Sequence, residues 1–246
     1  MNVLDLFSGI GGFSLGLEST GFFKTIAFVE KDKFCQKVLQ KNFPNIPIED
    51  DVRNVRGEKY KAEIITGGFP CQPFSVAGKR RGTDDDRFLW DETIRIVSET
   101  KPKWFIGENV EGIINIQDGM VFRQIHDDLE SEGFETQSLI IPASGKGAWH
   151  QRKRVWIIGC NVSNTNTRQH IGENEKIQTR RNAFNNFYQQ GKKNWWQTQS
   201  ELCGVPNGVQ YELYPDRANR IKSLGNSIVP QIAREIGLSI MEAEIG

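Results

Sequence analysis

Short apolar strands alternate with helix-like segments through residues 1–160, and this alternation restricts the chain to an α/β sheet protein. The strand-like runs are residues 3–7, 26–29, 62–65, 104–106, 136–141 and 155–158. Apolar side chains recur at helical spacing in residues 33–41, 122–129 and 229–240. We therefore expect one α/β domain in which helices pack on a sheet.

Residues 160–216 have a different composition. They hold sixteen Asn and Gln in 57 positions, as many as the other 189 positions together. Because their apolar periodicity is weak, they are predicted to form a small loop-rich insertion, with a solvated surface loop as the alternative. The main domain is then expected to consist of residues 1–159 and 217–246.

The charge distribution favours a polyanionic partner although the total charge does not. The 31 basic and 31 acidic residues cancel. Residues 145–200, however, hold ten Lys and Arg against two Glu, a net charge of +8 that leaves −8 for the rest of the chain. A polyanion would experience this local charge, because exposed charges are screened beyond about 8 Å at physiological salt.

Composition also argues against several classes of protein. No apolar run approaches the roughly 18 residues that a membrane helix needs. The first strand-like run begins almost at Met1 with no basic segment before it, so no signal peptide is expected. The four cysteines form no C-x-x-C pair, which argues against a zinc site or a disulfide framework and favours a reducing cytoplasm.

A glycine-rich turn, residues 5–14, follows the first strand and opens a helix. Such a turn lets a ligand approach the backbone, and the helix start offers free N–H groups. Ser14 replaces the third glycine of the dinucleotide fingerprint, so a pyrophosphate ligand is not expected. Glu30 ends the second strand-like run and Asp51 ends another short segment, and they could bind ribose hydroxyls and an adenine amino group. The pattern suits S-adenosylmethionine, and the alternative is a structural turn with two solvent-exposed acids.

Cys71 lies in a glycine- and proline-rich loop, residues 67–75, after the third strand-like run. A cysteine that served only for packing would more commonly lie in an apolar run, so Cys71 is predicted to be a nucleophile. Because a free thiol has a pKa of about 8.5, it would need nearby positive charge to ionise at neutral pH. The alternative is an inert loop cysteine.

Further charged residues are expected near this loop. Glu108 follows the fourth strand-like run and is predicted to lie on the same sheet edge as Cys71, as a proton donor or as a helix-capping acid. Arg152 and Arg154 alternate along a basic strand, so both point to one side. They could fork to a phosphate or a base oxygen, or form only a charged edge strand.

Taken in order, these residues resemble the motifs of the cytosine-C5 DNA methyltransferase family over nearly the whole chain. The matching motifs are residues 5–12 (D-L-F-S-G-I-G-G), 68–75 (G-F-P-C-Q-P-F-S), 108–110 (E-N-V), 152–159 (R-K-R-V-W-I-I-G) and 225–230 (G-N-S-I-V-P). Five motifs in the family's order are hard to obtain by chance. The resemblance implies a Rossmann-like, S-adenosylmethionine-dependent methyltransferase sheet, with residues 160–216 as a small target-recognition domain.

The resemblance implies transfer of a methyl group from S-adenosylmethionine to C5 of a flipped cytosine in a specific sequence of double-stranded DNA. Cys71 would attack C6 of the ring, Glu108 would hold N3, and Arg154 would hold O2. Arg152 would support the site or bind a phosphate. No base for the C5 proton is identified, and no metal is implied.

Cofactor and substrate positions are implied in the same way. Those expected to hold S-adenosylmethionine are Phe7, Gly9, Gly11, Gly12, Glu30, Asp51, Val52, Pro70, Asn226, Ser227 and Ile228. Those expected to contact the substrate are Gln72, Ser75 and Asn109. Residues 78–90 correspond to the loop that closes over DNA in the family.

The resemblance leaves some roles open. Trp149 and His150 stand where the family usually has Pro and Gln, so His150 has either a hydrogen-bonding or a structural role. A cytoplasmic, monomeric enzyme of a bacterium or phage is implied, with a cognate restriction endonuclease in a restriction–modification system. The alternatives are a tRNA cytosine-5 methyltransferase and a catalytically silent DNA-binding relative. The presence of Cys71, Glu108 and Arg154 argues against the silent relative.

Overall fold

The computed structural model describes residues 1–70, 89–146, 152–162 and 217–245 of the 246-residue chain. The predicted target-recognition domain, residues 160–216, falls almost entirely outside these ranges. Its boundaries therefore stay a prediction, as does the matching division of the main domain.

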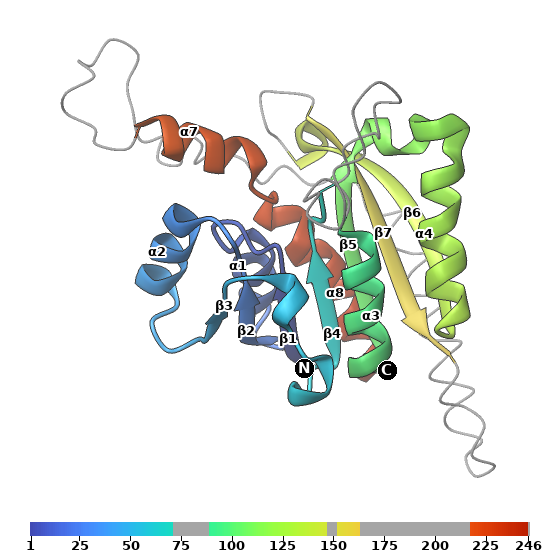
Figure 1. The fold of residues 1–246 in the computed structure, drawn as a ribbon, viewed down its shortest axis with the longest axis horizontal. Coiled ribbons are helices and arrows are strands. Elements are labelled where there is room, and N and C mark those ends of the chain that lie inside the picture. The colour runs from blue at the N-terminus through green and yellow to red at the C-terminus, as the bar shows by residue number, and fades with distance from the viewer. Residues whose placement is uncertain (71–88, 147–151, 163–216, 246) are drawn as a thin grey trace.

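Seven strands form one sheet in the order β3-β2-β1-β4-β5-β7-β6 (Figure 1). They are β1 (Asn2–Leu6), β2 (Lys24–Val29), β3 (Ile48–Glu49), β4 (Ile64–Gly67), β5 (Trp104–Val110), β6 (Phe134–Pro142) and β7 (Lys153–Asn161). The first five are parallel, and β7 runs antiparallel to both β5 and β6. Strand β1 pairs with β2 on one side and with β4 on the other, so the order of the strands reverses at β1. Sheets of this α/β type bind ligands at the carboxyl ends of the strands where the order reverses.

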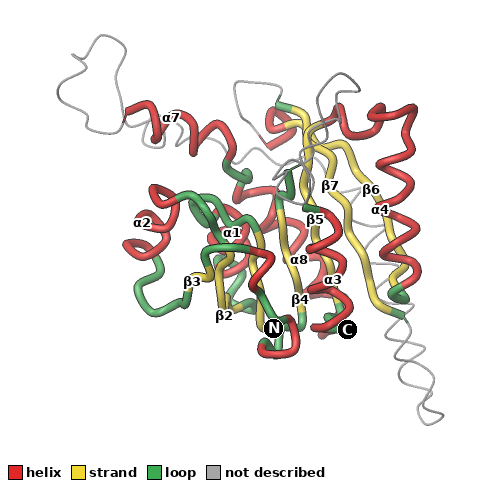
Figure 2. Tube along the Cα trace, viewed as in Figure 1, coloured by secondary structure: helices red, strands yellow, loops and turns green. Residues whose placement is uncertain are grey.

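Helices cover both faces of the sheet (Figure 2). They are α1 (Gly12–Glu18), α2 (Lys33–Asn42), α3 (Trp90–Thr100), α4 (Met120–Ser131), α7 (Arg217–Asn226) and α8 (Pro230–Ile245), with 3-10 turns η1 (Val52–Asn54), η2 (Gly57–Lys59), η3 (Glu111–Gly119) and η4 (Ala143–Lys146). On β7, Val155 and Ile157 pack with α3 and α4, whereas Trp156 and Ile158 pack with α1 and α8. Within the described ranges no helix has the length and apolarity to cross a membrane.

The predicted α/β sheet is confirmed, and each of the six strand-like runs overlaps an observed strand. The two-residue strand β3 was not predicted, because so short a segment gives no periodicity. One local expectation was wrong: Glu108 lies within β5 rather than after it. The reason is that β5 pairs with β7 as far as Val110, which lies opposite Arg154. This pairing keeps residues 108–110 extended.

Helix α1 lies unusually close to α8 because glycine occupies the contact. A Cβ atom added at Gly16 would lie 2.2 Å from the carbonyl oxygen of Pro230 and 2.8 Å from Cβ of Ala233. Across the same contact, a Cβ at Gly237 would lie 2.8 Å from Leu17. The glycine inside a seven-residue helix therefore exists for packing and not for backbone flexibility.

We predict that Gly16→Ala destabilises the protein, because backbone atoms must move to admit the methyl group. The expected loss in the free energy of unfolding is about 1–3 kcal/mol, measured by urea denaturation. The matched control is Gly112→Ala, where an added Cβ meets nothing within 4 Å in the part of the chain that the structure describes. Equal stability of the two variants would contradict the close contact between α1 and α8.

Candidate active site at the carboxyl edge of the sheet

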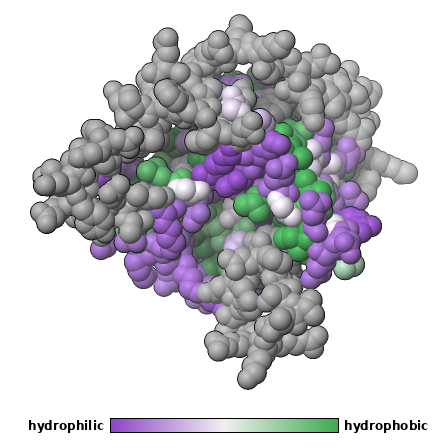
Figure 3. All heavy atoms as spheres, turned by 90° about the horizontal axis from the view of Figure 1, so that it is seen from above, coloured by the Kyte–Doolittle hydropathy of each residue, from purple (hydrophilic) through white to green (hydrophobic). Residues whose placement is uncertain are grey.

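The described site residues gather at one edge of the sheet. The parallel strands β1 to β5 end there, and the antiparallel strand β7 begins there. Figure 3 looks onto this edge and shows apolar side chains in green near its middle, between hydrophilic surfaces in purple. An edge of this kind suits a ligand with both apolar and polar parts.

The glycine turn after β1 has three glycines with different surroundings. Gly9 has φ +55°, and no atom of the described residues lies within 4 Å of an added Cβ. Gly11 has φ +88°, and its Cβ would lie 2.8 Å from the ring of Phe43. At Gly12 the Cβ would lie 2.7 Å from the carbonyl oxygen of Ile228. Of the three, Gly9 therefore offers open space to a ligand, whereas Gly11 and Gly12 allow close packing. Phe7, just before the turn, has φ +52° and is half-buried.

Asp5 is a fully buried carboxyl group beneath the turn, and sequence reasoning did not assign it a role. Thr66 Oγ1 donates to its Oδ1 at 2.7 Å, and Ser14 Oγ donates to its Oδ2 at 3.1 Å. Burial raises the pKa of Asp5 to about 7, against the lowering effect of these two hydroxyl groups. Ser14 thus stands in place of the third glycine because its hydroxyl group satisfies Asp5. The available signal was an acid inside an apolar strand.

Glu30 lies directly beside the turn. Its Oε2 accepts a hydrogen bond from the Gly9 N–H at 2.6 Å, and its Oε1 accepts one from the Asp32 N–H at 2.7 Å. Burial raises the pKa of Glu30, while these N–H groups oppose the increase. The N–H of Lys31 also bonds this carboxylate, so of its roughly four acceptor positions about one remains for a hydroxyl group of a ligand.

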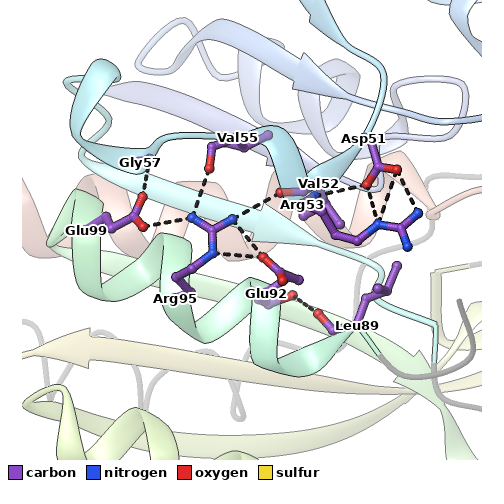
Figure 4. Close-up of polar contacts among 10 residues, drawn as sticks. Asp51, Val52, Arg53, Val55, Gly57, Leu89, Glu92, Arg95 and Glu99 are labelled. Atoms are coloured by element: carbon purple, nitrogen blue, oxygen red, sulfur yellow. Dashed lines mark hydrogen bonds and ion pairs between the residues drawn. The ribbon is translucent and has the colours of Figure 1, made fainter. Parts of the chain in front are cut away.

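Asp51 and Val52 follow β3 at the same edge. The Arg53 guanidinium pairs with Asp51 through Nη2–Oδ2 at 2.7 Å and Nε–Oδ1 at 3.0 Å (Figure 4). The hydrogen bonds from Arg53 lower the pKa of Asp51, which keeps it an anionic acceptor. Val52 is buried and begins the turn η1.

The buried Glu108 pairs with the half-buried Arg154 where β5 and β7 meet. Arg154 Nε lies 3.0 Å from Glu108 Oε1, and Glu108 is 8% exposed. Burial raises the pKa of Glu108 to about 7, although Arg154 and Arg152 favour the ionised form. A Cβ added at Gly68 would lie 3.6 Å from Glu108 Oε2, so the carboxyl group borders the start of the cysteine loop.

Asn109 uses its side chain to hold that loop. Its Nδ2 donates to the Phe69 carbonyl oxygen at 2.8 Å, and its Oδ1 accepts from the Val110 N–H at 2.9 Å. Asn109 therefore supports the backbone of the loop at Phe69, in addition to its predicted contact with the substrate. Pro70 is half-buried and is the last described residue of this stretch. The predictions for Cys71, Gln72, Ser75, His150 and most of residues 78–90 lie outside the described residues.

Arg152 connects β7 to the C-terminal segment. Its Nη2 donates to the Ser227 carbonyl oxygen at 2.7 Å, and its Nη1 donates to the Leu224 carbonyl oxygen at 3.4 Å. Its buried Nε has no hydrogen-bond partner within the described part of the chain. Burial and the neighbouring Arg154 lower the pKa of Arg152.

The C-terminal segment lies beside the glycine turn, as expected for residues 226–228. Ile228 is buried against Gly12, and Ser227 Oγ donates to the Ile228 carbonyl oxygen at 3.0 Å. Asn226 is exposed at the end of α7. Among the residues that the structure places, no cluster of three or more His, Cys, Asp or Glu could hold a metal ion.

We predict that Asp5→Asn stabilises the protein more at pH 8 than at pH 5. The raised pKa means that folded Asp5 keeps a proton between about pH 4 and 7 that the unfolded chain loses, so stability falls as pH rises through this range. The amide stays neutral, and its advantage at pH 8 should be on the order of 1 kcal/mol, or about 2–4 °C in Tm. Thermal denaturation at both pH values tests this, with exposed Asp91→Asn as the control. A pH-independent difference would contradict the prediction.

Solved structures with similar folds include methyltransferases. A DNMT2 variant of Spodoptera frugiperda superposes with a TM-score of 0.70 over 98% of this chain and 99% of that chain, at 16% identity, which establishes the fold alone. A protein described as a DNA modification methyltransferase from an E. coli prophage has a TM-score of 0.56 at 29% identity, over 65% of this chain and 47% of that one.

Sequence comparisons give the family. Type II methyltransferase M.Bsp6I of Bacillus sp. (strain RFL6) is 37% identical over 65% of this chain and 52% of its own length. M.FnuDI of Fusobacterium nucleatum is 35% identical over 72% of this chain and 53% of its own. The chain thus spans about half the length of these curated relatives. The family model of C-5 cytosine-specific DNA methylases matches residues 1–203, and together with the motifs at the sheet edge this shows that the chain belongs to that family.

Proposed function

We propose that this chain is a DNA (cytosine-5)-methyltransferase that transfers a methyl group from S-adenosylmethionine to C5 of a cytosine in duplex DNA, with a transient bond between Cys71 and C6. The observation that carries the proposal is the buried Glu108, paired with Arg154 beside Gly68, because it provides a carboxyl group with a pKa of about 7 next to the cysteine loop. Membership of the C-5 cytosine-specific DNA methylase family supports the same activity.

The residues around the glycine turn fit S-adenosylmethionine. Among the described residues, nothing fills the space where a side chain of Gly9 would be, and the Glu30 carboxylate beside it has an acceptor position left for a ribose hydroxyl. Asp51 and Val52, which follow the neighbouring strand β3, would flank the adenine ring. When bound, S-adenosylmethionine supplies an electrophilic methyl group on a sulfonium.

The protein side chains would make the cytosine ring reactive. Attack of the Cys71 thiolate at C6 places negative charge on N3 and O2, and makes C5 a nucleophile. Glu108 would hold a proton at N3, and Arg154, already fixed by its contact with Glu108, would donate to O2. After methylation, loss of the C5 proton restores the ring and expels the Cys71 sulfur.

The proposed partner is double-stranded DNA. Residues 145–200 carry a net charge of +8, which suits the phosphate backbone. C6 of a stacked cytosine is out of reach of a cysteine side chain, so the base would have to be flipped. By analogy with the Type II relatives, we propose a monomeric enzyme of the cytoplasm that works with a cognate restriction endonuclease.

Labelled S-adenosylmethionine, incubated with the protein and cytosine-containing duplex, should give 5-methylcytosine that bisulfite sequencing locates. Cys71→Ser should abolish turnover and keep DNA binding. A duplex with 5-fluorocytosine at the target should become covalently attached to the wild-type protein and not to Cys71→Ser, because fluorine cannot leave as the C5 proton does. Methylation of tRNA and not of DNA would replace the proposed substrate, and methylation of neither would remove the activity.

We predict that Glu108 causes a fall in the methylation rate as pH rises through about 7. Its raised pKa means that the protonated form, which serves N3, is lost above this pH. Glu108→Gln cannot lose a proton, so it should be about 10²-fold slower and lack this decline. Comparing single-turnover rates of the two proteins from pH 6 to 8 removes the effect of Cys71 ionisation, which both share. Parallel pH profiles would contradict the role of Glu108.

A further inference from the structure

The segment that follows β3 is fastened to helix α3 by one arginine. Arg95, in the middle of α3, points its guanidinium at η1 and at Val55, which follows it (Figure 4). Its Nη1 donates to the Val55 carbonyl oxygen at 2.9 Å, and its Nη2 donates to the Val52 carbonyl oxygen at 3.3 Å. A single side chain therefore fixes two peptide groups of the turn that begins at Asp51.

Two glutamates of α3 hold the guanidinium in place. Glu92 accepts from Nε at 2.8 Å, and Glu99 accepts from Nη1 at 2.7 Å. Glu92 and Glu99 raise the pKa of Arg95, and Arg95 with the Gly57 N–H lowers the pKa of Glu99, so both groups stay charged. All three nitrogens of Arg95 are thus used, and its side chain is only 33% exposed.

Glu99 also holds the far end of the same segment. Its Oε2 accepts from the Gly57 N–H at 2.6 Å. A Cβ added at Gly57 would lie 2.7 Å from Cβ of Glu99 and 2.8 Å from the carbonyl oxygen of Ile96. The backbone from Val52 to Gly57 therefore lies directly against α3, held at three points by Arg95 and Glu99.

Arg95 makes more hydrogen bonds than a simple surface ion pair would. Exposed ion pairs contribute little to stability, and a Lys–Glu pair would suffice for one. Here the planar guanidinium is shared between carboxylates on its own helix and carbonyl oxygens on another segment. Lysine carries its three donors on one nitrogen atom and could not match the donors that Arg95 places on three separate nitrogens.

We propose that Arg95 is a positioning residue for recognition of the adenine ring of the methyl donor, because it fixes the turn that presents Asp51 and Val52. This inference rests on the proposed function. Asp51, held by Arg53, is an acceptor with no proton to give. Correctly placed, it accepts from the 6-amino group of adenine and repels the 6-oxo group of hypoxanthine. If the turn shifts on α3, this discrimination is lost before the rest of the donor site is affected.

Isothermal titration with S-adenosylhomocysteine and with S-inosylhomocysteine, on the wild type and on Arg95→Met, tests the proposal. The methionine keeps the length of the stem and removes every donor. We expect S-adenosylhomocysteine to bind about tenfold more weakly, the loss from one poorly made hydrogen bond to a charged group, and S-inosylhomocysteine to bind about as before. The preference for the amino ligand should therefore fall about tenfold.

Two further variants keep the test decisive. Arg95→Lys should lose part of the preference, which provides a readout if Arg95→Met does not fold. Lys103→Met removes an ion pair with Glu63 at the opposite edge of the sheet and should leave both affinities unchanged. Equal weakening of both ligands, or a lower Tm with unchanged affinities, would show that Arg95 is only structural. No binding of S-adenosylhomocysteine by the wild type would instead overturn the proposed function, and this inference with it.

Discussion

The antiparallel pairing of β5 with β7 is the contact on which the rest of the candidate site depends. It keeps Glu108 in an extended strand and places Arg154 two register positions from it, so that a buried carboxyl group meets a half-buried guanidinium. An unpaired charge on this buried carboxyl group would cost several kcal/mol. The pair allows Glu108 to change its protonation state near neutral pH at the end of a rigid strand.

The turns at the sheet edge are also held in place by hydrogen bonds from polar side chains of neighbouring elements. Asp5 joins α1 to β4 through Ser14 and Thr66, so the glycine turn and the strand that leads to the cysteine loop share one buried acid. Asn109 and Arg152 use their side chains on backbone carbonyl oxygens of neighbouring loops. Backbone groups at these loops are thereby satisfied and fixed, which is what a preorganised site requires.

The sequence predicted the edge and the groups that end there, because parallel strands bring their carboxyl ends together whatever the loops contain. It predicted the six longer strands and the return of residues 226–228 to the glycine turn. It did not predict the contacts of Arg95 with Val52 and Val55, or of Arg152 with Ser227, which join residues 40 to 75 positions apart. Such contacts depend on how two elements face each other, and neither periodicity nor a motif records that.

The position of α8 has a consequence for synthesis of the protein. Gly12 and Gly16, near the beginning of the chain, are packed by Ile228, Pro230 and Ala233, more than two hundred residues later. During synthesis, the apolar side of α1 therefore stays uncovered until α8 has emerged, because their contact joins residues more than two hundred positions apart. A nascent chain that stops short of α8 leaves the glycine turn without one wall, so this edge of the sheet would be completed only after α8 has been made.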